Sequence, residues 1–500
     1  MSTRSTIRHI SGLLVLTAIA LCIHGYHPYA EDAEIYLPGV LKILHPGLYP
    51  LNTQFFEDHA RHTLYPNLIA ASIRMTHLPL DWAAFLWQVA SIFLMLLAAS
   101  RLASALFEEE RARWAAVCLM AALLTLPVAG TSLYIVDQYL NPRNLAAFAA
   151  VFAVTETLHR RYLVACLWLA FAAAVHPFMS TFPIMFCIWM AILRRYQPKI
   201  LGFAAGRSSP VPALVAGLVL PFGITLAPPP AEYHEVALSR PSHFLLRWEW
   251  YEWLGLIGPM ILFWWFARVG QRRGMKNLEL VARAMVPYVI IAAMAAAILS
   301  ASARLEALAR LQPLRCLALC YMVLIVVGGG LLGRHVLQRS TWRWLALFIP
   351  LSVGMYMAQR QEFPASAHLE WPWSQPRNYW AQAFDWVRDN TPTEALFALD
   401  PQHMNLPGED ETGFRARAQR SRLADDNKDR GAASMFPPLS IPLAEQIRDE
   451  ENWKQFQQSD FERLQRKYGV TWIVVQQPGP PGLDCPYENP AVRVCHLTGS

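Results

Sequence analysis

An acidic cluster, Glu31-Asp32-Ala33-Glu34, directly follows the first hydrophobic run of the chain. Adjacent carboxylates can accept a proton as a general base or bind a divalent metal ion, which prefers oxygen ligands. Charges at the end of a membrane span are easily solvated, and they gain interest when other loops on the same side also carry ionisable groups. Several later loops of this chain do, so the sequence predicts a site at the outer surface of a membrane.

Composition indicates a membrane protein. Hydrophobic residues make up 54% of the 500 residues and charged residues 16%, which no ordinary soluble domain of this size shows. Residues 359–500 hold 15 Lys and Arg against 20 Asp and Glu, a net charge of −5, whereas residues 1–358 hold 28 against 17, a net charge of +11. A basic excess in the apolar part indicates cytoplasmic loops rather than a surface for nucleic acid.

Eleven hydrophobic runs are candidate membrane spans, several of them shorter than the roughly 20 residues that cross a bilayer. They are roughly 10–26, 82–106, 113–132, 143–158, 161–177, 179–194, 211–226, 252–268, 279–300, 314–333 and 342–358. Residues 65–78 are apolar but short and contain Arg74 and His77, so we expect a helix that lies along the outer surface. We expect the first run to stay as a membrane anchor rather than to be cleaved as a signal peptide.

The positive charges fix the predicted orientation. With eleven spans, every basic loop falls on the side of the amino terminus, as the positive-inside rule requires. The basic residues of these loops include Arg4, Arg8, Arg111, Arg113, Arg160, Arg161, Arg194, Arg195, Arg268, Arg272, Arg273, Lys276, Arg334, Arg339 and Arg343. We therefore predict a multi-pass protein of the cytoplasmic membrane, with its amino terminus inside and its tail outside, in the periplasm or its equivalent.

The predicted outer loops carry most of the residues that are suited to chemistry. The first, about 27–81, contains the acidic cluster and the string Glu57-Asp58-His59-Ala60-Arg61-His62, which looks like a metal site but is interpreted as the exposed face of a loop helix. Later outer loops contribute Asp137, Asn141, Arg143, His176, Gln312 and Arg315. Inner loops hold mainly Lys and Arg, apart from Glu108 to Glu110.

The tail is long enough for one soluble domain. Helix-like segments at about 377–389 and 458–467 precede apolar runs at about 395–399, 471–475 and 491–497, a pattern typical of an α/β domain.

Two further features of the tail support predictions of their own. The polar stretch 407–440 is interpreted as a loop that folds over the site, with its basic residues solvated. These are Arg415, Arg417, Arg420, Arg422 and Lys428. Cys485 and Cys495 lie apart from the other cysteines and can form a disulfide in an oxidising outer compartment.

In architecture the chain resembles the C-type (GT-C) membrane glycosyltransferases, polytopic enzymes that take sugar from a polyprenyl-phosphate donor on the outer leaflet. The resemblance extends over the whole chain: an acidic motif in a long first outer loop, a surface helix after it, about eleven spans and an outer carboxy-terminal domain. The tail strings 383–392 (AFDWVRDNTP) and 467–475 (KYGVTWIVV) also resemble those of the superfamily. The fold implied is a transmembrane GT-C-like domain over residues 1–358, followed by a small extracytoplasmic α/β domain over residues 359–500.

The resemblance implies transfer of a sugar from a polyprenyl phosphate to a lipid, glycan or protein acceptor. Glu31-Asp32 matches the family's first-loop acidic motif and Asp137 its second-loop acidic residue, so these three are the expected catalytic residues. Asp32 is expected to be the base or the carboxylate that binds the acceptor, with Glu31 or Glu34 in support. Arg143 and Arg315 are expected on the phosphate, because guanidinium groups bind phosphate oxygens bidentately. The expected substrate-binding residues are Glu34, Arg143, His176, Gln312 and Arg315. Mg²⁺ or Mn²⁺ on Asp32 and Glu31 is the candidate cofactor, since a divalent ion would neutralise phosphate.

Plainer interpretations stay open. The acidic cluster can be a solvated loop start, the two arginines can bind ordinary lipid phosphates, and His176 before Pro177 can cap a break between helices. The chain can also be a catalytically silent GT-C-like scaffold, a lipid-binding protein, or a transporter or flippase for a lipid-linked substrate. A transporter would place ionisable residues near the membrane midplane, whereas this chain places them at the outer ends of spans. The sequence shows no Gly-rich nucleotide loop, zinc pattern or Ser-His-Asp order.

Overall fold

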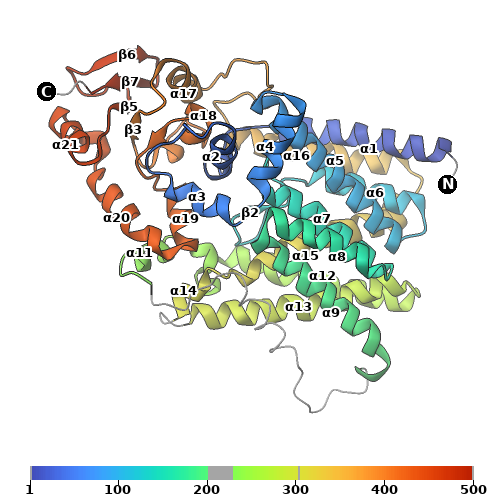
Figure 1. The fold of residues 1–500 in the computed structure, drawn as a ribbon. Coiled ribbons are helices and arrows are strands. Elements are labelled where there is room, and N and C mark those ends of the chain that lie inside the picture. Colours follow the sequence, from blue (N-terminus) through green and yellow to red (C-terminus); the bar gives the residue numbers. More distant parts are fainter. Residues whose placement is uncertain (1–2, 201–228, 302–304, 498–500) are drawn as a thin grey trace.

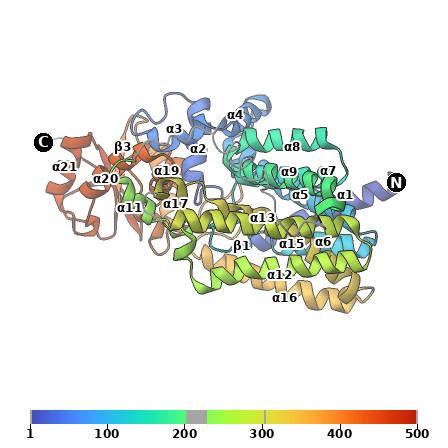
Figure 2. The same cartoon turned by 90° about the horizontal axis from the view of Figure 1, so that it is seen from below.

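A computed structural model describes residues 3–200, 229–301 and 305–497. The apolar part forms a bundle of long helices, and the carboxy-terminal part packs against one end of it (Figure 1). The amino terminus lies at the other end of the bundle, which Figure 2 shows from a second direction.

The long helices lie close to the predicted hydrophobic runs. They are α1 (Thr3–His24), α5 (Leu80–Leu106), α6 (Glu110–Ala122), α7 (Pro142–Leu158), α8 (Tyr162–Val175), α9 (Pro177–Ile200), α12 (Trp250–Arg272), α13 (Lys276–Ser300), α15 (Cys316–Leu332) and α16 (Thr341–Glu362). The predicted span 211–226 lies outside the described residues.

Within the described residues, 6 helical stretches are long and apolar enough to cross a membrane. They are Thr6–His24, Leu80–Leu106, Pro177–Arg195, Trp250–Arg272, Lys276–Ser300 and Glu306–Leu337. Tyr162–Val175 is a shorter apolar helix. The chain is therefore a multi-pass membrane protein.

The prediction of a span over 113–132 is wrong in its second half. Helix α6 ends at Ala122, and β1 (Pro127–Val128) pairs with β2 (Leu133–Tyr134) in a short antiparallel hairpin. Gly130 in the turn has φ +65°, a conformation that other residues rarely adopt, and a Cβ there would lie 2.3 Å from the indole of Trp248. Apolar composition alone does not separate such a buried hairpin from a helix.

The loops that carry the basic residues meet at the end of the bundle away from the carboxy-terminal part. Nη1 of Arg194 donates to the carbonyl oxygen of Leu158 at 2.9 Å, and Nδ2 of Asn277 donates to the carbonyl oxygen of Ala105 at 2.9 Å. These bonds join α9, the end of α7, the start of α13 and the end of α5. The ends of α5, α7 and α9 and the start of α13 therefore meet at one end of the bundle.

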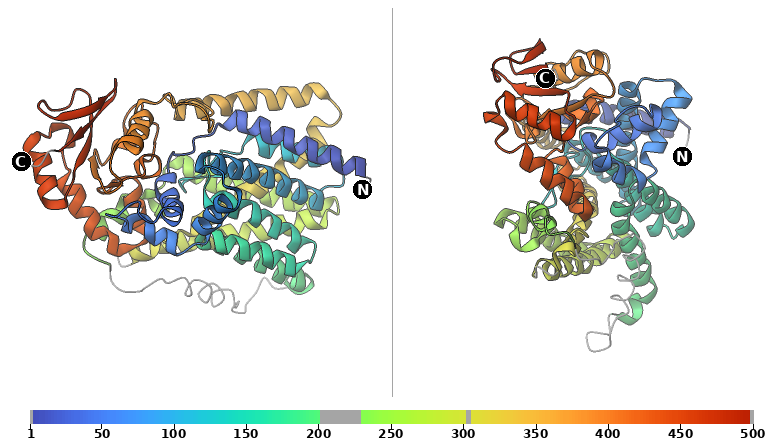
Figure 3. Two further views of the ribbon diagram at one scale, coloured as in Figure 1. Left: turned by 45° about the horizontal axis from the view of Figure 1, so that its top comes forward. Right: turned by 60° about the vertical axis from the view of Figure 1, so that its left-hand side comes forward.

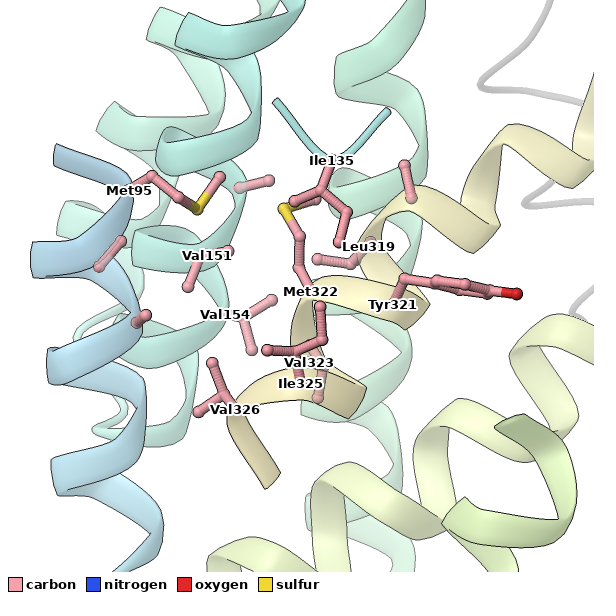
Figure 4. Close-up of a cluster of buried hydrophobic side chains, with 14 of the residues drawn as sticks. Met95, Ile135, Val151, Val154, Leu319, Tyr321, Met322, Val323, Ile325 and Val326 are labelled. Atoms are coloured by element: carbon pink, nitrogen blue, oxygen red, sulfur yellow. The ribbon is translucent and has the colours of Figure 1, made fainter. Parts of the chain in front are cut away.

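The interior of the bundle is closely packed. Figure 4 shows Met95 of α5, Val151 and Val154 of α7, and Val323 of α15 in one buried cluster. A Cβ on Gly329 of α15 would lie 2.7 Å from the Cα of Ala116, so the glycine permits close contact between α15 and α6.

Short elements gather at the end of the bundle that meets the carboxy-terminal part. They are α2 (Ala33–Leu44), α3 (Gln54–Arg61), α4 (Tyr65–Thr76), α11 (Tyr233–Leu238), η2 (Pro241–His243), η3 (Leu245–Arg247), α14 (Glu306–Ala309) and η5 (Pro313–Arg315). With 12 residues, α4 is too short to cross a membrane, and it packs against α2 and α5. The backbone N–H of Leu64 donates to the carbonyl oxygen of Ala174 at 2.7 Å, which fixes the start of α4 at the end of α8.

The carboxy-terminal part contains a five-stranded sheet flanked by helices (Figure 3). Its elements are α17 (Tyr379–Asn390), β3 (Leu396–Leu399), η7 (His403–Asn405), α18 (Phe414–Ala418), β4 (Ser421–Arg422), α19 (Lys428–Met435), η8 (Pro437–Leu439), α20 (Ser440–Asp449), η9 (Trp453–Gln455), α21 (Gln458–Tyr468), β5 (Trp472–Gln476), β6 (Asp484–Glu488) and β7 (Val492–His496). The strand order is β4-β3-β5-β7-β6, with β3 parallel to β4 and β5, and β7 antiparallel to β5 and β6.

Alternation along the strands places a helix on each face of this sheet. Phe397 and Val474 face one side and pack with Phe384 of α17, whereas Ile473 and Val475 face the other side and pack with Phe461 of α21. Cys485 of β6 and Cys495 of β7 are joined by a disulfide.

Candidate functional site between the bundle and the carboxy-terminal part

Arg143 joins two of the carboxylates that the sequence singled out. Its Nη1 donates to Oδ2 of Asp32 at 2.6 Å, and its Nε and Nη2 lie 3.3 and 3.2 Å from Oδ2 of Asp137. Asp32 precedes α2, and Arg143 lies in the first turn of α7, where Oδ1 of Asn141 accepts from its backbone N–H at 2.9 Å. The three side chains form one cluster, which we call the Asp32 triad.

Asp32 is accessible and Asp137 is not. The side chain of Asp32 is 22% exposed and that of Asp137 is 4% exposed. Burial raises the pKa of Asp137, although the neighbouring Arg143 acts in the opposite direction. In this geometry Asp32 is the carboxylate that can reach a substrate, and Asp137 holds Arg143 in place.

Lys428 brings the carboxy-terminal part into the cluster. It contacts Oε2 of Glu31, and its Nζ lies 3.5 Å from Oδ1 of Asp32. The hydroxyl of Tyr139 lies 3.5 Å from Nη2 of Arg143 and accepts from the backbone N–H of Asp32 at 3.3 Å. The sequence analysis did not select Tyr139, and it interpreted Lys428 as a solvated residue of the stretch 407–440, because its partners Glu31 and Asp32 stand far away along the chain.

A mainly apolar pocket opens beside this cluster, between β2, α7, α9 and α15. Among the described residues that line it, the charged ones are Arg143 and Arg315. The others are Leu133, Tyr134, Ile135, Ala146, Ala147, Ala150, Met179, Phe182, Pro183, Ala318, Leu319 and Met322. The guanidinium of Arg315 also lies 5.6 Å from the ring centre of Phe178.

Several buried polar atoms near the pocket have no partner. They are Nε of Arg315, Nε2 of His176, Nε of Arg240 and Nδ1 of His59. A buried polar atom without a partner costs about 1–3 kcal/mol, and such atoms are few in native proteins. A ligand with several oxygens would supply partners, so these atoms mark where one can bind.

Burial favours the neutral form of the two histidines in this group. Burial and the positive charges of Arg143 and Arg315 hold the pKa of His176 well below its usual range. Burial lowers the pKa of His59 to about 4. The sequence analysis placed the segment of His59 on the exposed face of a loop helix. Arg61 is exposed there and pairs with Glu57, but the ring of His59 packs against Tyr36.

Arg240 is a site residue that the sequence analysis did not select. It follows α11, and its guanidinium donates to the carbonyl oxygen of Asn427 and lies 3.0 Å from the position that a Cβ on Gly431 would take. It thereby connects the bundle to α19. Its place in an outer loop with other arginines gave no signal that set it apart.

Two predicted substrate-binding residues point elsewhere. Oε1 of Glu34 accepts from Nη1 of Arg415 at 3.3 Å, its Oε2 accepts from the backbone N–H of Ala416 at 3.2 Å, and the residue is 0% exposed. Nε2 of Gln312 lies 3.2 Å from the sulfur of Met435 in α19. Both residues hold the carboxy-terminal part in place, and the structure does not bring them to the pocket.

The basic residues of 407–440 are buried, which corrects the interpretation of a solvated run. Arg415 and Arg422 are 1% and 0% exposed. Nη2 of Arg415 donates to Oδ2 of Asp429 at 2.6 Å, and Nη1 of Arg422 donates to Oδ2 of Asp425 at 3.0 Å. Carboxylates of the same segment compensate these charges, so a polar sequence here folds into a buried network rather than a loop in water.

The surroundings of Asp32 and Glu31 do not fit a divalent metal ion. Their oxygens face Arg143 and Lys428, two cationic side chains that a metal ion would have to displace. The described part of the chain has no group of three His, Cys, Asp or Glu residues that could hold a metal ion. No chemical step is assigned to a metal here.

Comparison with known proteins gives structural neighbours only. No family model and no curated protein matches the sequence. The solved structures that match include the arabinofuranosyltransferase AftD from Mycobacteria, with 14% identity, a TM-score of 0.42, and coverage of 100% of this chain and 40% of that chain. The neighbours are GT-C fold glycosyltransferases. This chain thus spans well under half the length of AftD.

A second neighbour matches over nearly its whole length. ArnT from Cupriavidus metallidurans bound to undecaprenyl phosphate has 14% identity, a TM-score of 0.28, and coverage of 99% of this chain and 98% of that chain. The same protein in its apo state has 11% identity and a TM-score of 0.27. Roles of individual residues are therefore argued from the site itself.

Proposed function

We propose that this chain transfers a sugar from a polyprenyl-phosphate donor to a lipid, glycan or protein acceptor at the outer face of the cytoplasmic membrane. One observation carries the proposal: the pocket beside Asp32 has apolar walls and two arginines, Arg143 and Arg315. An apolar wall suits a prenyl chain, and guanidinium groups suit its phosphate. Asp32 is partly exposed and bonded to Arg143, so it is placed to act on an acceptor.

The proposed reaction is a substitution at the anomeric carbon. Asp32 accepts the proton of the acceptor hydroxyl as the acceptor oxygen bonds to the anomeric carbon, and the bond between that carbon and the phosphate oxygen breaks. The electron pair leaves with the polyprenyl phosphate. Positioning of the two reactants and removal of the proton supply the rate enhancement.

The charged residues of the site would stabilise the departing phosphate. Nε of Arg315 and Nε of Arg240 are both buried without a hydrogen-bond partner. Each can donate a hydrogen bond to a phosphate oxygen. Neutral His176 can donate through its Nε2–H, because its Nδ1 already accepts from the backbone N–H of Met179 at 3.4 Å. Asp137 positions Arg143 through its two contacts.

The proposal includes the topology. Eleven spans with the amino terminus inside place the basic loops in the cytoplasm and the carboxy-terminal sheet outside, as an extracytoplasmic domain. Polyprenyl-phosphate sugars present their headgroups at the outer ends of spans, and the proposed topology puts the Asp32 triad at that level. Lys428 and Arg240 show how the outer part would close the site, since each bridges the bundle and α19.

The deciding experiment compares three proteins with labelled polyprenyl-phosphate sugars: wild type, Asp32→Asn and, as a control, Asp58→Asn in the same predicted loop. Asp32→Asn keeps the shape but removes the base, so transfer should fall by about 10²–10⁴ while the protein stays folded. Asp58→Asn should transfer like wild type. Equal rates for all three proteins, or no binding and no transfer across a panel of donors, would reject the proposal.

A second candidate is a protein that binds a polyprenyl phosphate without transferring its sugar. The observation that favours it is that both oxygens of Asp32 already face cations, Arg143 at 2.6 Å and Lys428 at 3.5 Å. The same assay separates the two: donor binding that is lost in Arg315→Lys, with no transfer by wild type, supports the binding protein.

A further inference from the structure

A second charged pocket lies at the opposite end of the bundle from the Asp32 triad. It is a cavity of about 220 Å³ lined by Glu109, Arg111, Arg273, Gly333, Arg334 and His335. These residues come from three places: the turn from α5 to α6, the turn from α12 to α13, and η6 (Gly333–Leu337), which follows α15. Figure 1 shows this end of the bundle on the side of the amino terminus.

The carboxylate of this pocket is already paired. Nε of Arg334 lies 3.1 Å from Oε1 of Glu109, and its Nη1 lies 3.1 Å from the sulfur of Met275. Within the described residues, no ion pair is found for Arg111 or Arg273. Two guanidinium groups that line one cavity without an anion leave it with a net positive charge, with His335 beside them.

The backbone holds this arrangement tightly. A Cβ on Gly333 would lie 2.8 Å from the carbonyl oxygen of Arg111 and 2.5 Å from the Cβ of Ala115, so η6 is pressed against the start of α6. The segment Gly333–Leu337 is a π-helical turn, a rare feature that is frequent at functional sites. Close packing and a π turn together direct Arg334 and His335 to the same cavity as Arg111 and Arg273.

Membrane-facing surfaces lie beside the pocket. Near it α12 exposes Ile261, Trp264 and Trp265, and α16, which packs against η6, exposes Trp342 and Leu345. Tryptophan is enriched where a bilayer meets water, which is also the depth of lipid phosphates. Basic pockets between helices at such a level bind anionic lipid headgroups.

We infer that the cavity lined by Arg111, Arg273, Arg334 and His335 binds a phosphate group, carried by an anionic phospholipid or free in solution. Arginine recognises phosphate by pairs of parallel hydrogen bonds, and two unpaired guanidinium groups can share one phosphate. This inference is independent of the proposed transferase activity, because the pocket lies at the other end of the bundle.

The matched pair of variants is Arg273→Gln and Arg272→Gln. Both residues are exposed at the end of α12, but only Arg273 lines the cavity in the described part of the chain. Arg111→Gln tests the second arginine. The full-length proteins are purified in detergent, and their unfolding midpoints without added ligand serve as the control for folding.

Two probes separate the two sources of phosphate. Native mass spectrometry counts how many molecules of dioleoylphosphatidylglycerol stay bound to the protein, with dioleoylphosphatidylcholine as the neutral comparison. Binding of inorganic phosphate is measured as the shift of the thermal unfolding midpoint when phosphate is added at constant ionic strength. We expect at least one probe to bind wild type and Arg272→Gln alike and to bind Arg273→Gln and Arg111→Gln about tenfold more weakly, a difference of about 1.4 kcal/mol.

The pattern of loss identifies the ligand. Loss confined to phosphatidylglycerol assigns the pocket to a lipid headgroup, and loss confined to inorganic phosphate assigns it to a free anion. Loss of both shows a general phosphate site. If neither probe distinguishes Arg273→Gln from Arg272→Gln, the inference is wrong.

Discussion

Helix α2 and the residue before it contribute to two arginine-centred clusters of similar composition and different surroundings. One is the Asp32 triad of Asp32, Arg143 and Asp137. The other, which we call the Glu34 triad, consists of Glu34, Arg415 and Asp429. Their first members are two residues apart in the sequence, and each arginine bridges two carboxylates.

The two triads differ in exposure. The side chains of Glu34, Arg415 and Asp429 are 0, 1 and 0% exposed, whereas those of Asp32 and Arg143 are 22 and 14% exposed. The Glu34 triad joins the bundle to α18 and α19 and has no space for a ligand. The Asp32 triad borders a pocket and polar atoms without partners. The same residue types therefore hold the two parts together in one place and are available for chemistry in the other.

Removing the central arginine should separate these roles, and Arg415→Gln gives the largest expected effect. It leaves Asp429 and Glu34 buried without a full cation, so the free energy of unfolding should fall by about 3–5 kcal/mol, the usual cost of breaking a buried ion pair. Thermal unfolding in detergent measures it. Arg143→Gln is the comparison and should destabilise less, because it leaves one buried carboxylate, Asp137, without its cation, whereas water can reach Asp32. Similar losses for the two variants would contradict the distinction.

A milder substitution tests the Asp32 triad for function. Arg143→Lys keeps the charge but cannot contact Asp32 and Asp137 with the geometry of a guanidinium. We expect sugar transfer to fall by about tenfold to a hundredfold, which is roughly 1–3 kcal/mol, with the unfolding midpoint almost unchanged. The parallel change Arg415→Lys should show the reverse, a loss of stability larger than any loss of transfer per folded molecule. If Arg143→Lys is also destabilised, both triads stabilise the fold and the proposed distinction between them is wrong.

The helices and strands were predictable where a hydrophobic run of the sequence was long and uninterrupted. α5 and α13 follow the predicted runs 82–106 and 279–300 closely, and β3 and β5 lie at the apolar runs of the tail. The prediction failed at residues 123–132, because the backbone at Gly130 and the space needed by Trp248 decide between hairpin and helix. That decision depends on a residue far away in the sequence.

The site was predictable as a list of residues but not as an arrangement. Asp32, Asp137 and Arg143 are recognisable by type and by place at the ends of hydrophobic runs, and the structure brings them together. Glu34 looks equivalent to Asp32 in the sequence. Its partner Arg415 stands 381 positions away, and nothing local indicates that the two meet in a buried cluster.

The smallest expected effect concerns the protonation of Glu34. Burial raises the pKa of Glu34 from its ordinary value of 4.5 to about 7, and Arg415 opposes this rise only in part because its shorter contacts go to Asp429. The folded state thus holds a proton on Glu34 that the unfolded state has released. Stability from this group is full below pH 4.5 and is lost as the pH rises through about 7.

Replacing Glu34 with glutamine removes this titration and leaves an amide of similar shape. Between pH 6 and 7.5 the wild type should lose about 1 kcal/mol relative to Glu34→Gln, because each unit of pKa difference corresponds to about 1.4 kcal/mol. Unfolding midpoints of both proteins across this range measure the difference, with Asp58→Asn as a control that should follow wild type. Parallel pH profiles for wild type and Glu34→Gln would contradict the raised pKa and would show that Glu34 stays ionised beside Arg415.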